Sequence, residues 1–292
     1  MRRAASTIAA LVLAGAAAIG AQQPVYRSEA AGVPVTVSVR SAGKAVTGLT
    51  AQDFTITDNG IAQKVSSVSV ESLPIDVTLL LDVSGSVSGA RLERLKSSVI
   101  ETAKLLRPVD RVRLIAMQYE LRQVFGYQAG GTRPPIEQLT AFGGTSLYDG
   151  LAAAMMRAGE PGRRQLIVAS TDGDDTISIL PEASVKEIAE YADAVVHVII
   201  PVVGGRNAKP SSTPAMTTLN DVTVRTGGQV FSIDPGAPIN DAFAQALEEF
   251  RTSYVLRYQP EGTLTPGWHE VTVAVKGGPY DIRARKGYSV RK

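Results

Sequence analysis

The sequence predicts an α/β protein in which a doubly wound, mostly parallel sheet is inserted into a small β-sandwich formed by the N- and C-terminal strands. Between residues 75 and 234, apolar runs of strand length alternate with segments of helical spacing, which indicates a parallel sheet covered by helices on both faces. The regions on either side show the period-two alternation of half-buried strands. Each flank has only about 40 residues and the chain has no cysteine, so we expect the two flanks to pack together.

The first residues have the layout of a cleavable signal peptide. Arg2 and Arg3 precede an apolar segment at 8–19, and a run of small residues ends at Ala21. The apolar segment is too short and too rich in alanine for a membrane span. We therefore expect export, to the periplasm or beyond it, with no integral membrane segment after cleavage. The predicted divisions are a signal peptide (1–21), an N-terminal β segment (22–73), a central α/β domain (74–250) and a C-terminal β segment (251–292).

The N-terminal flank is predicted to be β structure. Val35, Val37 and Val39 alternate with polar residues, as in a half-buried strand. The dipeptide Asn59-Gly60 lies between two further alternating stretches, and this dipeptide is a strong signal for a β-hairpin. Pro74 separates this flank from the central region.

Strands and helices are predicted to alternate along the central region. Strands are expected at 75–81, 111–119, 165–170, 194–200 and 229–233, with a short edge strand at 123–127. Helices are expected at 92–106, 146–158, 183–192, 215–226 and 237–250, and a Gly/Pro-rich loop at 203–214. Beyond residue 252, alternation at 254–258, 271–275 and 282–284 predicts more strands, with His269 expected at the surface.

The charge balance narrows the classes of partner. The chain carries a formal charge of +2, and cleavage after residue 21 would remove two arginines and no acidic residue. A neutral mature chain argues against nucleic acid and against an anionic membrane surface as partners. The absence of cysteine excludes disulfides and thiolate metal sites. The sequence carries no signal for an oligomeric state.

Oxygen-bearing side chains follow three predicted elements of the central region. Asp82, Ser84 and Ser86 come directly after a buried strand, Thr145 opens a helix, and Asp172 follows another strand. Because ligands of open α/β sheets bind outside the carboxyl ends of the strands, we expect these five side chains to meet at one edge. Carboxylates and hydroxyls are hard ligands, which select Mg²⁺ or Ca²⁺ over softer metals. The sequence therefore predicts a divalent cation site there.

These motifs resemble those of the von Willebrand factor type A family. The matching elements are Asp82-x-Ser84-x-Ser86, a Gly-Gly-Thr ending at Thr145 and a Thr-Asp-Gly containing Asp172, which together resemble that family's metal-ion-dependent adhesion site. The resemblance covers about residues 74–250 and implies a Rossmann-like α/β fold. The flanking stretches at 49–54, 58–60 and 283–288 are similar to the VWFA-related proteins of Acidobacteria.

The resemblance implies a role for each matched residue. Ser84 and Ser86 would coordinate the cation through their hydroxyls, and Thr145 would bind it directly or through water. Asp82 and Asp172 would hold coordinated waters, or one of them would bind directly. The cation would be Mg²⁺, or else Ca²⁺ or Mn²⁺. The remaining coordination position would take an Asp or Glu carboxylate from a protein or peptide partner, because few direct carboxylates leave the cation with residual positive charge.

Simpler interpretations exist for several of these residues. Asp, Ser and Thr are also favoured helix N-caps, so capping is an alternative for the first loop and a second role for Thr145. Asp149 is expected to face solvent or to brace its loop. Asp174 and Asp175 are expected to be solvated turn residues, with an adjacent Ca²⁺ site as the minor alternative. His197 is expected to be a packed strand residue rather than a catalyst.

The sequence thus favours an exported, non-enzymatic module that captures a partner carboxylate through a divalent cation. One alternative is a structural component of an envelope assembly, in which the metal only stabilises the loops. A less favoured alternative is a metal-dependent hydrolase, for which only Asp174 or Asp175 offers a general base. The sequence has no phosphate-binding loop ending in Lys-Ser or Lys-Thr and no His-Glu-x-x-His motif.

Overall fold

The computed structural model describes residues 32–70, 72–201, 213–234, 237–262 and 265–290. The predicted signal peptide at 1–21 and most of the predicted loop at 203–214 lie outside these residues. The division of the chain into the four predicted segments stays a prediction.

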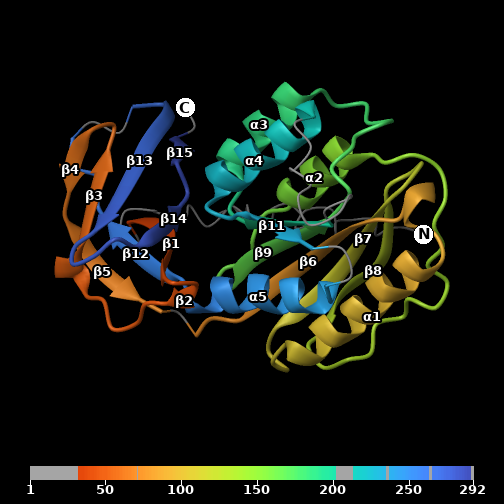
Figure 1. Ribbon diagram of the computed structural model, residues 1–292. Coiled ribbons are helices and arrows are strands. Elements are labelled where there is room, and N and C mark those ends of the chain that lie inside the picture. Colours follow the sequence, from red (N-terminus) through yellow and green to blue (C-terminus); the bar gives the residue numbers. More distant parts are fainter. Residues whose placement is uncertain (1–31, 71, 202–212, 235–236, 263–264, 291–292) are drawn as a thin grey trace, which may run out of the picture. The chain divides into compact units, whose positions relative to one another are not determined.

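A six-stranded sheet forms the centre of the α/β region (Figure 1), in the order β11-β10-β9-β6-β7-β8. All neighbouring strands are parallel except the edge strand β8, which runs antiparallel to β7. The doubly wound, mostly parallel α/β sheet expected from the sequence is therefore present. The strands are β6 (Ile75–Asp82), β7 (Arg111–Met117), β8 (Arg122–Ala129), β9 (Arg164–Ser170), β10 (Val195–Pro201) and β11 (Val230–Ile233).

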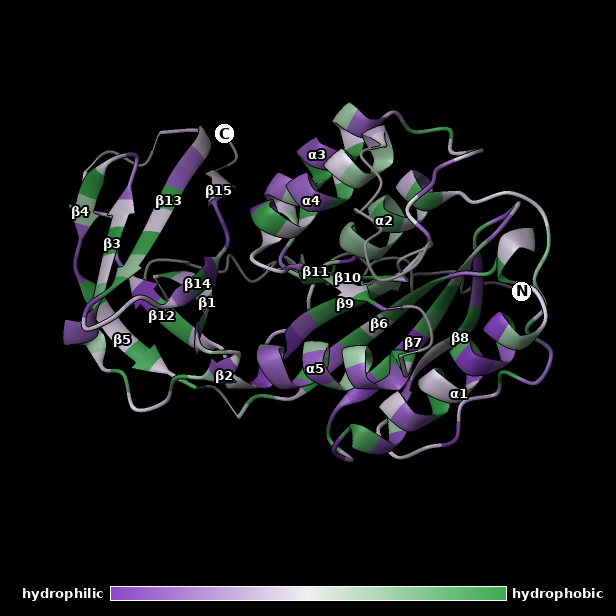
Figure 2. Cartoon of the chain, in the orientation of Figure 1, coloured by the Kyte–Doolittle hydropathy of each residue, from purple (hydrophilic) through white to green (hydrophobic). Residues whose placement is uncertain are grey.

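Helices cover both faces of this sheet. One face is covered by α1 (Ala90–Leu105) and α5 (Ile239–Thr252), and the other by α2 (Leu147–Met155), α3 (Glu182–Tyr191) and α4 (Pro214–Thr226). Strand β6 serves both layers because alternate side chains point to opposite faces, Leu79 and Leu81 to the first and Leu80 to the second. Figure 2 accordingly shows strands that are hydrophobic along most of their length and helices with one polar side. None of the described helices combines the length and the apolar character that crossing a bilayer requires.

The two flanks contribute to two further sheets. One has the order β14-β1-β12-β5, with β2 paired to β1, and the other has the order β15-β13-β3-β4. Strand β1, from the N-terminal flank, lies between two strands of the C-terminal flank, and its Val35 is opposite Leu256 of β12. Likewise Ile56 of β3 is opposite Val273 of β13. The bounds are β1 (Val33–Ser41), β2 (Lys44–Ala45), β3 (Phe54–Asp58), β4 (Ile61–Gln63), β5 (Val65–Ser69), β12 (Tyr254–Tyr258), β13 (Gly267–Val275), β14 (Asp281–Ala284) and β15 (Gly287–Val290).

The predicted Asn-Gly hairpin is confirmed as the turn between β3 and β4. Asp58 is opposite Ile61, and both turn residues have positive φ, 48° at Asn59 and 79° at Gly60. A turn with positive φ at two consecutive residues has the twist that matches the two strands of a two-residue β-hairpin. The strand that follows, β5, does not continue the hairpin but pairs with β12 in the other sheet.

The expectation that His269 lies at the surface is wrong. Its side chain is only 4% exposed, and its Nδ1 lies 2.9 Å from Asp58 Oδ1. The hydroxyls of Tyr258 and Tyr288 each donate to Asp58 Oδ2 over 2.8 Å. His269 shares the inward face of β13 with Val271, so the alternation places it inside, and the buried carboxylate provides the partner that makes this position tolerable for a polar ring.

Charged pairs join the flanking sheets to helix α5. Glu249 is 1% exposed, and its Oε1 accepts from Arg283 Nη1 of β14 over 3.2 Å. Gln229 Nε2 donates to Glu249 Oε2 over 2.7 Å. Burial raises the pKa of Glu249, although the nearby Arg283 opposes the shift. Glu248, the residue directly before Glu249, pairs with Arg40 of β1 at 3.1 Å.

Candidate functional site

The predicted metal ligands lie at the carboxyl edge of the central sheet. Asp82 is the last residue of β6, and Ser84 and Ser86 follow it at the short 3₁₀ turn η3 (Gly85–Val87). Asp172 lies two residues beyond the end of β9, and Thr145 lies two residues before α2. Because β6 and β9 are parallel neighbours, both carboxylates emerge at the same edge of the sheet.

Hydrogen bonds connect all five residues in one cluster, with one link made by a backbone N–H. Thr145 Oγ1 lies 3.4 Å from both carboxylate oxygens of Asp82, and the backbone N–H of Ser84 donates to Asp82 Oδ1 over 2.9 Å. The hydroxyls of Ser84 and Ser86 are 3.0 Å apart, and Ser86 Oγ donates to Asp172 Oδ2 over 2.9 Å. The structure therefore brings the five predicted residues together, while their role as metal ligands stays a prediction.

Neither carboxylate of this cluster has an ion-pair partner within the described part of the chain. Asp82 is 1% exposed, and the cation that lies toward it, Arg91, binds the carbonyl oxygen of Ser86 instead. Burial raises the pKa of Asp82, hydrogen bonds from Ser84 and Thr171 oppose this shift, and the charge of Asp172 adds to it. Asp172 Oδ1 is buried without a hydrogen-bond partner. A bound cation would compensate the negative charge of the two carboxylates and would give Asp172 Oδ1 a partner.

The donor set fits a hard cation. It consists of two carboxylates and three hydroxyls, and Mg²⁺ and Ca²⁺ prefer oxygen ligands of this kind. The described residues contain no cluster of three or more Asp, Glu, His or Cys side chains that could hold a metal ion. The predicted site contains only two such residues, so its coordination would depend on the hydroxyls, on water and on a partner.

Helix capping does not explain the first loop. The N-cap of α1 is Gly89, with φ 67°, and Ser84 precedes only the 3₁₀ turn and makes no side-chain cap bond. The second role suggested for Thr145 is also wrong, because Ser146 occupies the N-cap position of α2. The Ser146 hydroxyl donates instead to the carbonyl oxygen of Gln118 over 3.0 Å.

Thr171 is a member of the cluster to which the sequence assigned no role. Its Oγ1 donates to Asp82 Oδ2 over 3.2 Å and accepts from the backbone N–H of Gly173 over 3.1 Å. Gly173 has φ 92°, and a Cβ there would lie 2.7 Å from Met216 Sδ, so this turn requires glycine. The only sequence signal for Thr171 is a hydroxyl next to the predicted ligand Asp172, and its partner becomes visible only in the folded chain.

Asp149 and Asp175 hold the loop that follows Asp172. The carboxylate of Asp149 accepts from the backbone N–H groups of Ile179 and Leu180, each over 2.9 Å, so Asp149 braces a loop. Asp175 Oδ1 accepts from the N–H of Tyr148 over 3.2 Å and also from Ser178. Asp175 is therefore a structural turn residue rather than a freely solvated one.

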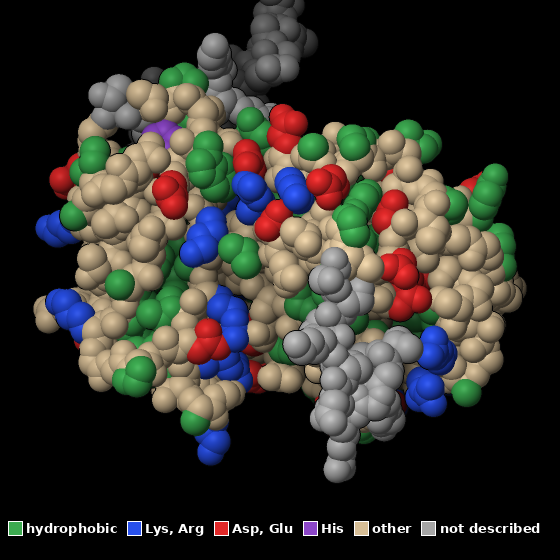
Figure 3. Space-filling model, turned by 45° about the horizontal axis from the view of Figure 1, so that its top comes forward, with side chains coloured by type: hydrophobic (Ala, Val, Ile, Leu, Met, Phe, Trp, Pro, Cys, Tyr) green, Lys and Arg blue, Asp and Glu red, His purple; other side chains and the backbone are tan. Residues whose placement is uncertain are grey.

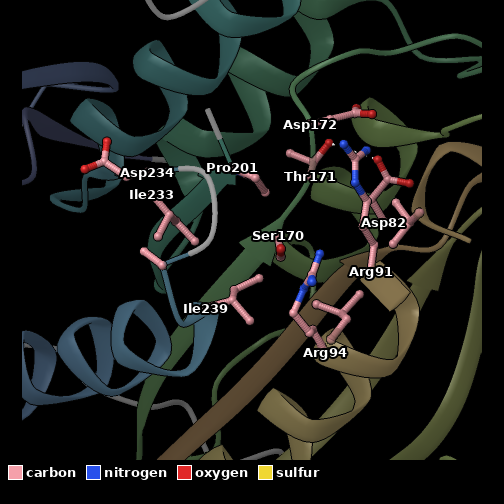
Figure 4. A pocket seen from close by; sticks show the side chains of 13 residues that line it. Asp82, Arg91, Arg94, Ser170, Thr171, Asp172, Pro201, Ile233, Asp234 and Ile239 are labelled. Atoms are coloured by element: carbon pink, nitrogen blue, oxygen red, sulfur yellow. Dashed lines mark hydrogen bonds between the residues drawn. The ribbon is translucent and has the colours of Figure 1, made fainter. Parts of the chain in front are cut away.

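A cavity of about 270 Å³ opens beside the two carboxylates. Figure 4 shows Asp82, Thr171 and Asp172 grouped at one end, with the side chain of Arg91 extending toward them. Arg91 Nη1 donates to the carbonyl oxygen of Ser86 over 3.3 Å. The remaining wall is mostly apolar: Val87, Leu95, Pro201, Ile233, Ala237 and Ile239 line it together with the polar residues Arg94, Ser170 and Asp234. A side chain entering this cavity would therefore lie next to the predicted metal ligands.

The chain is similar to one known family and to one curated protein. The family model described as von Willebrand factor type A domain matches residues 77–174. An uncharacterized protein from Synechocystis sp. is 33% identical over 109 residues, which is 35% of this chain and 26% of that protein. The chain thus spans about a quarter of the length of this curated relative.

Solved structures extend the similarity in fold to most of the chain. A von Willebrand factor type A protein from Catenulispora acidiphila superposes with a TM-score of 0.52 at 12% identity, over 90% of this chain and 74% of that one. The ArnB paralog VWA2 from Sulfolobus acidocaldarius superposes with a TM-score of 0.50 at 12% identity, over 86% of this chain and 75% of that one. Identities this low carry information about the fold alone.

Proposed function

We propose that residues 77–174, which match the von Willebrand factor type A model, form a domain of that family, and that the chain is a metal-dependent protein-binding module. Domains of that family are commonly protein-interaction modules. The proposed cation is Mg²⁺, with Ca²⁺ or Mn²⁺ as substitutes, and the proposed ligand is an Asp or Glu carboxylate of a partner protein. The residues that would hold the cation are Asp82, Ser84, Ser86, Thr145 and Asp172.

The observation that carries this proposal is the buried carboxylate of Asp82 beside the half-buried carboxylate of Asp172, with no ion pair to either among the described residues. Two neighbouring acidic groups of which one is buried cost free energy unless they are neutralised. A divalent cation would compensate both charges and would satisfy the unpaired Asp172 Oδ1. Because only two carboxylates are present and neutral hydroxyls complete the set, a bound cation would keep an attraction for one further anion. A partner carboxylate fits that requirement.

The charge distribution supports a protein partner over a polyanion. On the face seen in Figure 3, acidic and basic side chains are intermingled rather than separated by sign. Nucleic acid binding depends on clustered positive charge. We propose further that the protein is exported through its N-terminal segment and that the flanking strands form a sandwich into which the α/β domain is inserted, as in the VWFA-related proteins of Acidobacteria.

Metal binding is tested by calorimetric titration of the full chain with MgCl₂, CaCl₂ and MnCl₂, together with thermal unfolding in the presence of each salt or EDTA. We expect the metal to stabilise the folded chain by about 2.7 kcal/mol at a metal concentration one hundred times the Kd. Asp172→Asn should lose most of this gain. Asp174→Asn is the matched control, since Asp174 is an exposed neighbour outside the cluster, and it should behave like the wild type.

Partner capture is tested by pull-down from the native envelope fraction, with and without EDTA. Under the proposed function, Asp82→Ala abolishes chelator-sensitive capture and leaves the metal-free fold nearly intact. If Asp82→Ala lowers the melting temperature in Mg²⁺ but leaves capture unchanged, the metal only stabilises the loops and the proposal is wrong. An absence of heat and of thermal stabilisation with all three cations also rejects it.

A further inference from the structure

Large apolar side chains that are exposed to solvent gather around the candidate metal site. The described residues include twelve exposed large hydrophobic side chains, and five of them lie on loops at the carboxyl edge of the central sheet. We call these five the apolar collar: Tyr119 (67% exposed), Leu121 (37%), Phe142 (50%), Ile177 (36%) and Ile179 (91%). Single exposed apolar residues are ordinary, but a group of them marks a surface that binds something.

Three of the collar residues, Tyr119, Phe142 and Ile177, lie on segments that contact Thr145 or the glycines before it. The backbone N–H of Thr145 donates to Thr176 Oγ1 over 2.7 Å, and the N–H of Ile177 donates to the carbonyl oxygen of Thr145 over 3.2 Å. On the other side, a Cβ on Gly143 would lie 3.0 Å from Tyr119 Cβ. Phe142 directly precedes Gly143 in the chain. The metal-site residue Thr145 therefore has collar residues on both sides.

Hydrogen bonds of the backbone and of polar side chains hold the loop that carries Ile177 and Ile179. The two isoleucine side chains are left free for contact with a partner. The carboxylate of Asp149 binds the N–H groups of Ile179 and Leu180, and Ser178 Oγ accepts from the N–H of Tyr148 over 3.0 Å. A Cβ on Gly144 would lie 2.6 Å from Thr176 Oγ1, so this glycine allows the loop to pack closely. A loop fixed this way presents its apolar side chains with little ordering entropy left to lose on binding.

From this arrangement we infer that the partner of the metal site is a protein segment in which an acidic residue is flanked by large apolar residues. The inference rests on the proposed function, because the cation selects the acidic group by charge. The collar adds the second requirement, since an apolar surface next to the cation favours apolar neighbours of the bound carboxylate. A free small carboxylate would meet only the first requirement. The collar therefore determines which acidic segments are bound.

The test is a selection of random dodecapeptides displayed on phage against the immobilised full chain in MgCl₂, with elution by EDTA. We expect the eluted peptides to carry an Asp or Glu with at least two large apolar residues within three positions of it. Synthetic peptides with the selected sequence should bind the double variant Ile177→Ser/Ile179→Ser about tenfold or more weakly than the wild type, because the lost apolar contact area is substantial. Mg²⁺ binding by calorimetry should be unchanged.

The matched control is Val109→Ser/Met156→Ser, which removes two exposed apolar side chains (55% and 71% exposed) at the opposite edge of the sheet. This variant should bind the peptides like the wild type, and the melting temperatures of both double variants verify that they are folded. Acidic peptides without apolar neighbours among the eluate would overturn the collar's role and leave the metal-dependent function standing. A complete lack of EDTA-eluted peptides would contradict both. A wild-type dimer that becomes monomeric in Ile177→Ser/Ile179→Ser would assign the collar to self-association instead.

Discussion

Asp110 shows how one buried carboxylate can hold several elements of the α/β region together. It is fully buried and accepts from the backbone N–H of Ile75 at the start of β6 over 2.9 Å. Its other partners are Arg107 Nη2, from the turn after α1, and Arg251 Nη2, from the end of α5, each at 2.8 Å. Burial alone would raise the pKa of Asp110, but the hydrogen bonds from Arg107 and Ile75 lower it to about 2. The carboxylate is therefore strongly favoured in its charged form.

The first prediction concerns this residue. Asp110→Ala should lower the free energy of unfolding at neutral pH by about 3 kcal/mol, because it leaves Arg251 and a buried N–H without their partner. A carboxylate with a depressed pKa contributes stability above its unfolded-state value near 4, and this contribution is lost as the pH falls through about 2. Urea unfolding from pH 7 to pH 2 should show a smaller acid-induced loss in the variant than in the wild type.

Glu137→Ala is the control for Asp110→Ala. Glu137 pairs with Arg133 at 3.4 Å with both side chains more than half exposed, so its removal should change stability by no more than about 0.5 kcal/mol. Equal destabilisation by the two substitutions would show that Asp110 does not have the stabilising role assigned to it.

Some residues of the candidate site can be predicted from the sequence and others cannot. Asp82 and Asp172 were found because each follows a recognisable buried strand, and parallel strands end at a common edge. The role of Thr171 and the apolar collar were missed. Their positions depend on contacts between loops, such as Thr176 with Thr145, and loop contacts have no periodic signature in the sequence.

Helix α5 is the element that links the α/β region to the flanking sheets, through Glu249 and Arg283. We predict that Arg283→Leu lowers the free energy of unfolding by about 3 kcal/mol, because it leaves a buried carboxylate without its cation. The double variant Glu249→Gln/Arg283→Leu should be more stable than Arg283→Leu by about 1 kcal/mol or more, since no uncompensated charge remains and Gln229 keeps a hydrogen-bond partner. Denaturant unfolding of the wild type and the variants measures this coupling.

The contribution of the Glu249–Arg283 pair to the free energy of unfolding should depend on pH. Burial raises the pKa of Glu249, so its ionised form costs stability, and this cost falls as the carboxylate becomes protonated at lower pH. Without Arg283, which opposes the shift, the pKa of Glu249 should rise further, so the deficit of Arg283→Leu relative to the wild type should shrink as the pH is lowered from 7. If the deficit is independent of pH and the double variant is no more stable, the ion pair is not what joins α5 to β14.

At the scale of elements, hydrophobic periodicity located the strands and helices well but did not assign every partner. The helix expected at 237–250 is α5 (Ile239–Thr252), a displacement of two residues. Strand β5 directly follows the Asn-Gly hairpin in the chain, yet it pairs with β12 in the other sheet. Alternation tells which face of a strand is buried, but it does not identify the strand that will lie beside it.

For the whole molecule, the interleaving of the two flanks predicts how a truncated chain will behave. A chain ending at residue 252 lacks β12 and β14, the strands on either side of β1. It also lacks β13, which pairs with β3. The remaining two-stranded ribbons are marginal in water. Hydrogen exchange should show loss of amide protection at 33–41 and 54–58, while the strands of the central sheet stay protected. Retained protection of β1 and β3 in the truncated chain would mean that the C-terminal strands do not support them.

The pairing of β1 with β12 also bears on the order of events in folding. Val35 and Leu256 are about 220 residues apart in the chain, so this contact closes a very long loop, and contacts of that kind form slowly. The chain must be synthesised past residue 258 before β1 can pair with the whole of β12. Until then the backbone N–H and C=O groups of β1 have no strand partner there, and an unpaired strand of this kind is open to pairing with other chains.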